Sequence, residues 1–344
     1  MKTKLIYRMI SKATPRRLWN AFVVYASYRI SRLLRRPIQW GLPIGLSVEP
    51  TTSCNLRCPQ CPSGLRSFSR PTGMLDLPSF KRWLRPISGR LWTLQLYFQG
   101  EPLLHPGFSE AVRIGHDAGL FTMSSTNGHF LTEAHCHKLV ESGLDLLVIS
   151  IDGVDQERYQ EYRVGGSLEK VLDGSRELIR IRKQLKSKTP YLIFQMVVFR
   201  HNRHQIEAAK ELARQIGFDE IRFKTAQVYD ADSAVKLIPE EAVYARYARD
   251  ESGRFGLKNS LPDHCWRLWH SPVVSWDGKV LPCCFDKDAQ HIMGELPLAD
   301  FSSIWRGERY GNFRRALLRD RRSTDICRNC SEGNPVWITP RTRI

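Results

Sequence analysis

The chain has 344 residues, of which 42% are apolar and 25% charged, and its formal net charge is +17. This composition excludes a disordered chain, and the length favours one large domain with a smaller one. We find neither a signal-peptide pattern nor a run approaching the ~18 apolar residues that span a bilayer, so we expect a cytoplasmic protein. In that reducing compartment, nine cysteines indicate metal ligation or redox chemistry more than disulfides.

Residues 1–42 form a basic N-terminal extension. Residues 1–40 contain ten Lys or Arg and no acidic residue, which leaves a charge of +7 for the other 304 residues. A helix is predicted over 15–36, because apolar residues recur there at helical spacing, namely Trp19, Phe22, Val23, Ala26, Ile30, Leu33 and Leu34. The helix packs on the rest of the protein, makes peripheral contact with an anionic membrane, or, as the least favoured alternative, binds RNA.

Residues 43–235 alternate strand and helix patterns. Strands are predicted at 44–49, 94–98, 120–124, 146–150, 192–199 and 220–224. Helical patterns lie between several of them, at 108–119, 133–143, 168–185 and 204–217. Successive βα units predict an α/β fold with a parallel sheet, curved as a barrel or partial barrel. In such folds the reactive groups lie at the carboxyl ends of the strands.

Chemically distinctive residues follow four consecutive strands. The first strand is followed by Cys54, Cys58 and Cys61, with three and then two residues between them. The sequences QGEP (99–102) and STNG (125–128) follow the next two strands, and the fourth ends in SIDG (150–153). Three thiolates leave one iron of a 4Fe-4S cubane open to an external ligand. Zinc with a distant fourth ligand is the alternative.

The motif CNLRCPQC, followed in order by GEP and SIDG, resembles the radical S-adenosylmethionine (SAM) superfamily over roughly residues 44–225. The resemblance implies a partial (β/α)6 TIM-like barrel and an enzyme whose cluster is held by Cys54, Cys58 and Cys61. One electron from that cluster would cleave SAM to methionine and a 5'-deoxyadenosyl radical, which abstracts a substrate hydrogen. An electron donor such as flavodoxin or ferredoxin is implied.

The same resemblance implies SAM contacts by Gly100, Glu101, Thr126, Asn127, Ser150, Asp152, Arg163 and Gln195. Glu101 would bind the methionine ammonium, and Arg163 is a candidate partner for the SAM carboxylate. Two positions depart from the family pattern. Gln60 stands where many members have an aromatic ring, and Gln99 replaces the first glycine of Gly-Gly-Glu. Neither departure removes a cluster ligand.

Residues 236–344 contain a second set of cysteines. The pair Asp277-Gly278 predicts a hairpin turn that brings Cys265 and Cys283 together, and a Cys-x-x-Cys motif follows at 327–330. Four thiolates suit zinc and a fully ligated 4Fe-4S cluster equally. The spacing resembles the SPASM auxiliary-cluster domain in its shortened twitch form. This resemblance implies one auxiliary 4Fe-4S cluster held by Cys265, Cys283, Cys327 and Cys330, with Cys284 as the alternative to Cys283.

The sequence therefore predicts a radical SAM oxidoreductase or modifying enzyme with a small C-terminal auxiliary-cluster domain. Its substrate is a small molecule, a lipid precursor or a peptide. Two alternatives stay open: an RNA-modifying radical SAM enzyme, and a non-catalytic scaffold that binds zinc or a cluster.

Overall fold

The computed structural model of the protein describes residues 2–251, 253, 255–258, 261–332 and 336–338. One curved sheet organises it, with the strand order β11-β10-β9-β1-β2-β3-β4-β5-β6. The six strands of the predicted barrel are parallel and neighbour one another in chain order: β1 (Gly45–Val48), β2 (Thr93–Gln95), β3 (Phe121–Thr126), β4 (Leu146–Ser150), β5 (Tyr191–Val198) and β6 (Glu220–Thr225). The predicted partial barrel is confirmed.

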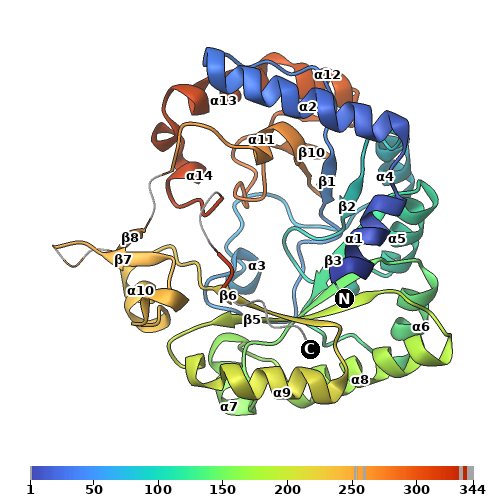
Figure 1. Cartoon of the computed structure of the whole chain (residues 1–344), viewed down its shortest axis with the longest axis vertical. Helices are drawn as coiled ribbons and strands as arrows, with labels where there is room; N and C mark the ends of the chain where they lie inside the picture. The colour runs from blue at the N-terminus through green and yellow to red at the C-terminus, as the bar shows by residue number, and fades with distance from the viewer. Residues whose placement is uncertain (1, 252, 254, 259–260, 333–335, 339–344) are drawn as a thin grey trace.

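Helices cover the outer face of these strands, as Figure 1 shows. They are α4 (Leu77–Leu84), α5 (Phe108–Asp117), α6 (Glu133–Glu141), α7 (Gln156–Tyr162), α8 (Leu168–Gln184) and α9 (Ile206–Ile216). Alternate strand residues such as Leu94, Phe194 and Phe223 belong to the core under these helices. Because side chains alternate along a strand, the residues between them face the concave side of the sheet. The inside of the curve therefore carries apolar residues such as Ile193 together with polar or charged ones such as Gln195 and Lys224.

Helix α1 (Lys2–Ser11), which the sequence did not predict, packs at the amino ends of the strands. Its Met9 joins an apolar cluster with Phe121 and Tyr191, the first residues of β3 and β5. The Met9 carbonyl accepts a hydrogen bond of 2.6 Å from the indole nitrogen of Trp92. This helix lies opposite the rim at which the distinctive motifs were predicted.

The predicted N-terminal helix is α2 (Pro15–Leu34), which crosses the top of the molecule in Figure 1. Its apolar stripe is not the face that docks on the protein. The helix packs through a largely polar face, formed by Arg17, Asn20, Val24, Ser27, Tyr28 and Ser31. These side chains bond to nearby backbone: the Asn20 amide bonds to both the N–H and the carbonyl of Leu42, and the Arg17 guanidinium donates to the Gly119 carbonyl.

The C-terminal region extends the barrel sheet, which the sequence did not indicate. Strand β9 (Val273–Val274) pairs in parallel with β1, and β10 (Lys279–Leu281) and β11 (Gly294–Glu295) follow in antiparallel order. The predicted hairpin is the β9–β10 pair. At the other edge, residues 336–338 bond to β6 through an antiparallel bridge between Trp337 and Lys224. Both edges of the barrel sheet are thus covered by C-terminal residues.

The other elements of the described chain belong to the cysteine loop, to the connections of the barrel and to the C-terminal region. They are α3 (Pro62–Leu65), α10 (Ala231–Leu237), β7 (Tyr247–Arg249), β8 (Phe255–Leu257), α11 (Arg267–His270), α12 (Phe301–Arg306), α13 (Glu308–Arg319), α14 (Asp325–Arg328) and the short 3-10 turns Pro102–Leu104, Arg203–Gln205, Ala242–Tyr244 and Arg321–Ser323. Helix α11 contacts α2, and Figure 1 draws α12 and α13 in the same upper part of the molecule.

Candidate active site and auxiliary cysteine pocket

The loop between β1 and α3 carries Cys54, Cys58 and Cys61. Cys58 is buried, whereas the other two thiols are partly exposed at the rim. The backbone N–H of Leu56 donates to the Cys54 sulfur at 3.4 Å. The Arg163 guanidinium reaches the Cys58 sulfur at 4.0 Å. A positive charge and an N–H donor next to the sulfurs favour thiolates, which is the form that binds iron.

Two glycines let this loop pack closely. A Cβ at Gly64 would lie 2.6 Å from the backbone nitrogen of Cys58, and a Cβ at Gly100 would lie 2.2 Å from the Thr51 carbonyl oxygen. Gly100 also has φ of +73°, a conformation that favours glycine. Its N–H donates to the Ser63 hydroxyl at 2.7 Å. The QGEP segment is therefore held directly against the cysteine loop.

The Glu101 carboxylate is buried beside the cysteine loop. It accepts hydrogen bonds from the Thr126 hydroxyl at 2.7 Å, from the Asn127 N–H at 2.7 Å and from the Leu103 N–H at 3.1 Å. Burial raises the pKa of Glu101, and the Asn127 and Thr126 hydrogen bonds oppose that rise. A carboxylate has about four acceptor positions, so three bonds leave room for one more donor. An ammonium group suits that position.

Asp152 and Arg163 form a buried ion pair on the same rim, with 2.6 Å between Arg163 Nε and the carboxylate. The second Asp152 oxygen accepts from the Val197 N–H at 2.7 Å. Ser150 and Gln195 are register partners on β4 and β5 beside this pair. The structure thus brings the predicted SAM-contacting residues together, but it commits one edge of Arg163 to Asp152, which the sequence did not show.

Burial opposes ionisation of two thiols of the loop, those of Cys54 and Cys58, when no metal is bound. Burial raises the pKa of Cys54 to about 11 and also raises the pKa of Cys58, although the Arg163 charge opposes the second shift. Cluster binding must therefore displace protons from these sulfurs. A cavity of about 320 Å³ adjoins Cys54 and is lined by Thr52, Ser53, Cys54, Ser63, Arg66, Phe68 and Thr72. The donor set and the adjoining space fit a cluster with one side open.

The second set of cysteines lines one pocket. Its walls include Cys265, Cys283, Cys327 and Cys330, together with the apolar residues Leu268, Phe285, Phe313, Leu317 and Ile326. Cys284, the alternative to Cys283, is not among the lining residues. The Arg321 guanidinium donates to the Cys330 sulfur at 3.3 Å, as does the Glu332 N–H. Four thiols around an apolar pocket with N–H donors fit an enclosed iron-sulfur cluster.

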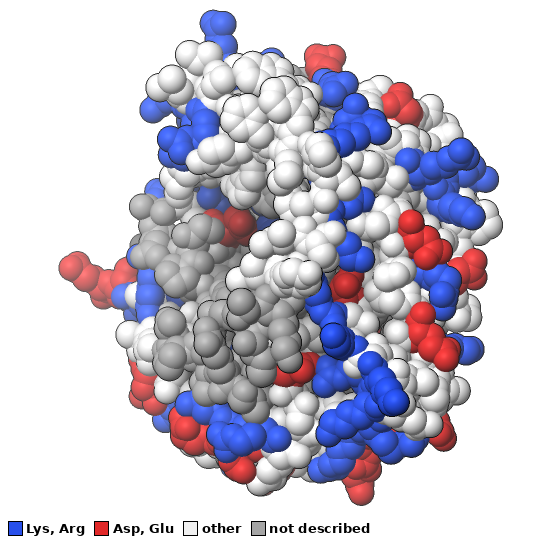
Figure 2. Space-filling view, turned by 45° about the vertical axis from the view of Figure 1, so that its right-hand side comes forward, with Lys and Arg blue, Asp and Glu red and all other residues white. Residues whose placement is uncertain are grey.

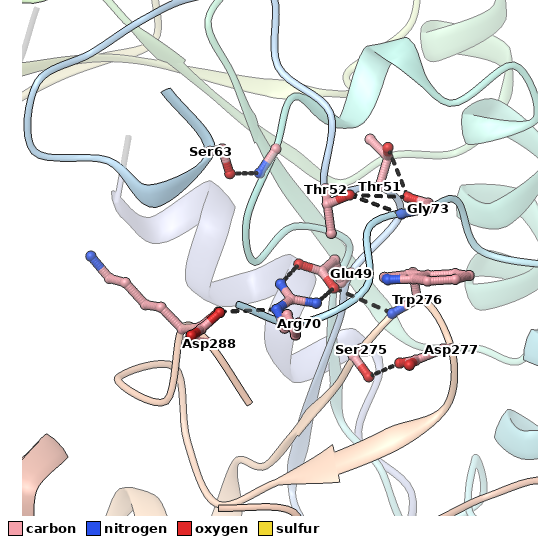
Figure 3. A network of polar contacts seen from close by, with 12 residues as sticks. Glu49, Thr51, Thr52, Ser63, Arg70, Gly73, Ser275, Trp276, Asp277 and Asp288 are labelled. Carbon is pink, nitrogen blue, oxygen red and sulfur yellow. Dashed lines mark hydrogen bonds and ion pairs between the residues drawn. The ribbon is translucent and has the colours of Figure 1, made fainter. Parts of the chain in front are cut away.

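An ion pair that sequence reasoning missed joins the two cysteine regions (Figure 3). Glu49, at the end of β1, binds Arg70 through two bonds of 2.6 and 2.8 Å, and both side chains are almost fully buried. The Glu49 carboxylate also accepts from the Trp276 N–H at 3.3 Å, and Arg70 donates to the Lys287 carbonyl at 3.2 Å. The pair therefore links the loop after the cysteines to the β9–β10 hairpin. In the sequence, Glu49 is simply the last residue of a predicted strand.

Comparisons with known proteins match both the barrel with its cysteine loop and the region of the auxiliary cysteines. Residues 48–218 match the model of the radical SAM superfamily, and residues 265–331 match SPASM, an iron-sulfur cluster-binding domain. The chain belongs to the radical SAM superfamily and carries a SPASM domain. It is therefore an enzyme of that class, and its cofactors are SAM and 4Fe-4S clusters.

Curated relatives and solved structures agree with this assignment. A PqqA peptide cyclase from Ruegeria pomeroyi is 26% identical over 318 residues, which cover 85% of this chain and 80% of the relative. An AdoMet-dependent heme synthase from Methanosarcina barkeri is 28% identical over 225 residues, covering 64% of this chain and 62% of that protein. The structure of Streptococcus suis SuiB bound to S-adenosylmethionine shares the fold, with a TM-score of 0.61, 15% identity and coverage of 85% of this chain and 72% of that one.

Proposed function

We propose that the protein abstracts a hydrogen atom from a peptide substrate. Held by Cys54, Cys58 and Cys61, a reduced 4Fe-4S cluster would supply the electron that cleaves SAM to methionine and the 5'-deoxyadenosyl radical. The PqqA peptide cyclase relative, which matches 85% of this chain, supports a peptide as the substrate. The observation that carries the catalytic assignment is the buried Glu101 carboxylate, which binds the STNG turn while the Glu101 N–H donates to the Ser53 carbonyl of the cysteine loop.

The residues of the rim divide the tasks in this proposal. Cys54, Cys58 and Cys61 ligate the cluster, and Glu101 binds the SAM ammonium through its remaining acceptor position. Thr126 and Asn127 hold that carboxylate, while Asp152 positions Arg163 toward the SAM carboxylate. Gly100 permits the close approach of the two loops. Ser150 and Gln195 face the same space from β4 and β5.

The auxiliary pocket holds one further 4Fe-4S cluster, ligated by Cys265, Cys283, Cys327 and Cys330. The choice of Cys283 over Cys284 rests on the walls of the pocket. A cluster with four thiolate ligands has no open iron, so it transfers electrons or orients substrate rather than binding it. A protein such as flavodoxin or ferredoxin donates electrons to the enzyme.

The test is reductive SAM cleavage by the anaerobically reconstituted protein. Wild type should form 5'-deoxyadenosine with dithionite, and Glu101→Gln should weaken SAM binding while it keeps the iron content. Asn202→Asp would be a poor control, because the side-chain amide of Asn202 donates a hydrogen bond to the backbone carbonyl of Asp152. Glu141→Gln, on the exposed end of α6, is a suitable one. Failure of wild type to form 5'-deoxyadenosine contradicts the proposed function.

The outward face of α2 supports peripheral contact with an anionic membrane, and a lipid-linked substrate is the second candidate. Because polar residues dock the helix, its apolar stripe points away from the protein: Trp19 is 66% exposed, Phe22 61% and Leu33 82%. In Figure 2, blue Lys and Arg side chains border white surface in the upper part of the molecule. No helix in the described part of the chain meets the length and hydropathy of a membrane span.

An apolar face beside arginines and without acids matches an interfacial helix better than an RNA site, where phosphates contact the basic groups. Each basic residue near an anionic surface contributes about 1 kcal/mol. The full chain should sediment with anionic vesicles at low salt, and the triple variant Trp19→Gln, Phe22→Gln, Leu33→Gln should not. Leu298→Gln, an 82% exposed leucine outside α2, is the matched control. Equal sedimentation of wild type and the triple variant contradicts membrane contact.

A further inference from the structure

The concave side of the sheet carries a group of positive charges near the carboxyl end of β6. Lys224 stands between Phe223 and Thr225 on β6, and the side chains of both neighbours are buried. Its ammonium is 5.8 Å from the ring centroid of Trp337, the residue that bridges to it. Strand alternation therefore directs Lys224 into the space enclosed by the sheet and its C-terminal cover.

Three other cations act electrostatically on this ammonium. Burial lowers the pKa of Lys224 to about 8. The positive charges of Arg246, Lys287 and Arg267 act in the same direction, whereas the Cys284 thiol opposes them. The Arg246 guanidinium is buried and donates to the Thr225 hydroxyl at 2.9 Å and to the Thr225 carbonyl, both uncharged acceptors. Lys287 lies over the Tyr229 ring, 4.5 Å from its centroid.

Lys224 and Arg246 have little charge compensation. Among the described residues, no carboxylate forms an ion pair with Lys224 or Arg246. The two carboxylates nearby are engaged, because Glu220 binds Arg222 at 2.7 Å and Glu332 binds Arg267 at 3.0 Å. Buried charges without a partner are costly, and a cluster of them repels itself. A bound anion removes both costs.

We propose that Lys224 and Arg246, with Lys287 and Arg267 around them, form a subsite for an anionic group of the substrate, a carboxylate or a phosphate. The inference rests on the proposed function, since the subsite occupies the concave face between the SAM rim and the auxiliary pocket. Arg267 lines that pocket. An anion held by Lys224 would anchor the substrate on the inner face of β6, across the barrel opening from Cys54, Cys58 and Cys61.

The test uses the reconstituted holoenzyme and two probes, inorganic pyrophosphate and glutarate, titrated calorimetrically with and without saturating SAM. We expect saturable binding to wild type, weakened at least about tenfold in Lys224→Met and retained in Lys224→Arg, as for loss of one partner of a buried charge pair. Lys236→Met, an exposed lysine on α10, is the control and should match wild type. The stronger probe identifies phosphate or carboxylate as the preferred group.

Three results would overturn the subsite: no binding of either probe to wild type, equal affinity in Lys224→Met and wild type, or displacement of the probe by SAM, which would assign the cations to the cofactor. If Lys224→Met does not fold, wild type is labelled with pyridoxal 5'-phosphate and borohydride. Pyrophosphate should then protect Lys224 from labelling in the peptide map, and an unprotected Lys224 contradicts the proposal. Formation of 5'-deoxyadenosine in the same preparation tests the proposed function separately.

Discussion

The two cysteine sites of this protein are built in opposite ways. Cys54, Cys58 and Cys61 lie within eight positions on one loop, and two of the three thiols are partly exposed at the rim. The auxiliary cysteines come from three separate segments and line a pocket with five apolar side chains. A cluster held by a single loop has one side open, whereas a cluster in a pocket closed by distant segments is surrounded by protein. The first arrangement suits binding of SAM, and the second suits a cluster that transfers electrons or orients substrate without binding it.

The largest effect should come from the open site. Cys58→Ala removes a ligand of the cluster that binds SAM, so 5'-deoxyadenosine formation should fall at least about 1,000-fold, to background. The measurement is chromatography of the dithionite-reduced reaction. Cys136→Ala, a buried thiol on α6 far from both sites in sequence, should keep the activity. Formation of 5'-deoxyadenosine by Cys58→Ala would show that Cys58 is not a ligand of the cluster that binds SAM.

The buried ion pair between Glu49 and Arg70 should stabilise the folded protein. Arg70→Met leaves the buried Glu49 carboxylate without its partner and should lower the free energy of unfolding by about 3–5 kcal/mol. The surface pair of Arg158 and Glu161 is the matched comparison, because Arg158→Met should cost less than about 1 kcal/mol. Denaturant unfolding of the holoprotein measures both. An equal decrease in the free energy of unfolding in the two variants would contradict a stabilising role of the buried Glu49–Arg70 pair.

Iron content should report the two sites independently. The reconstituted wild type should hold about eight iron and eight sulfide per chain, as two cubanes require. Replacing Cys54, Cys58 and Cys61 together by alanine should leave about four iron. Cys327→Ala should also leave about four, yet it should keep some 5'-deoxyadenosine formation, provided that the variant stays folded. One zinc with four or fewer iron in wild type would refute the auxiliary cluster.

The smallest effect distinguishes two adjacent thiols. Cys283 lines the auxiliary pocket and Cys284 does not. Cys283→Ala should therefore reduce the iron content to about four per chain, and Cys284→Ala should leave it at about eight. Iron analysis of the two variants, prepared side by side, decides the matter. The opposite result would assign the ligand to Cys284.

The sequence by itself determined the barrel and the open site, because their signals are local. Strand patterns and the three-cysteine motif each occupy fewer than about ten residues. The order of motifs after successive strands was sufficient to place Glu101, Thr126 and Asn127 at one rim, since parallel strands end on the same side.

Tertiary structure decided what depends on residues far apart in the chain. The sequence left open which face of α2 docks, because Asn20 and Arg17 bury polar groups against backbone that only the fold supplies. Helical periodicity records which residues share a face, but not whether the polar or the apolar face meets the protein. The Glu49–Arg70 pair and the cations around Lys224 likewise arise from contacts between distant segments. The energetic effect of such charges depends on burial and on neighbouring groups, which spacing along the sequence does not encode.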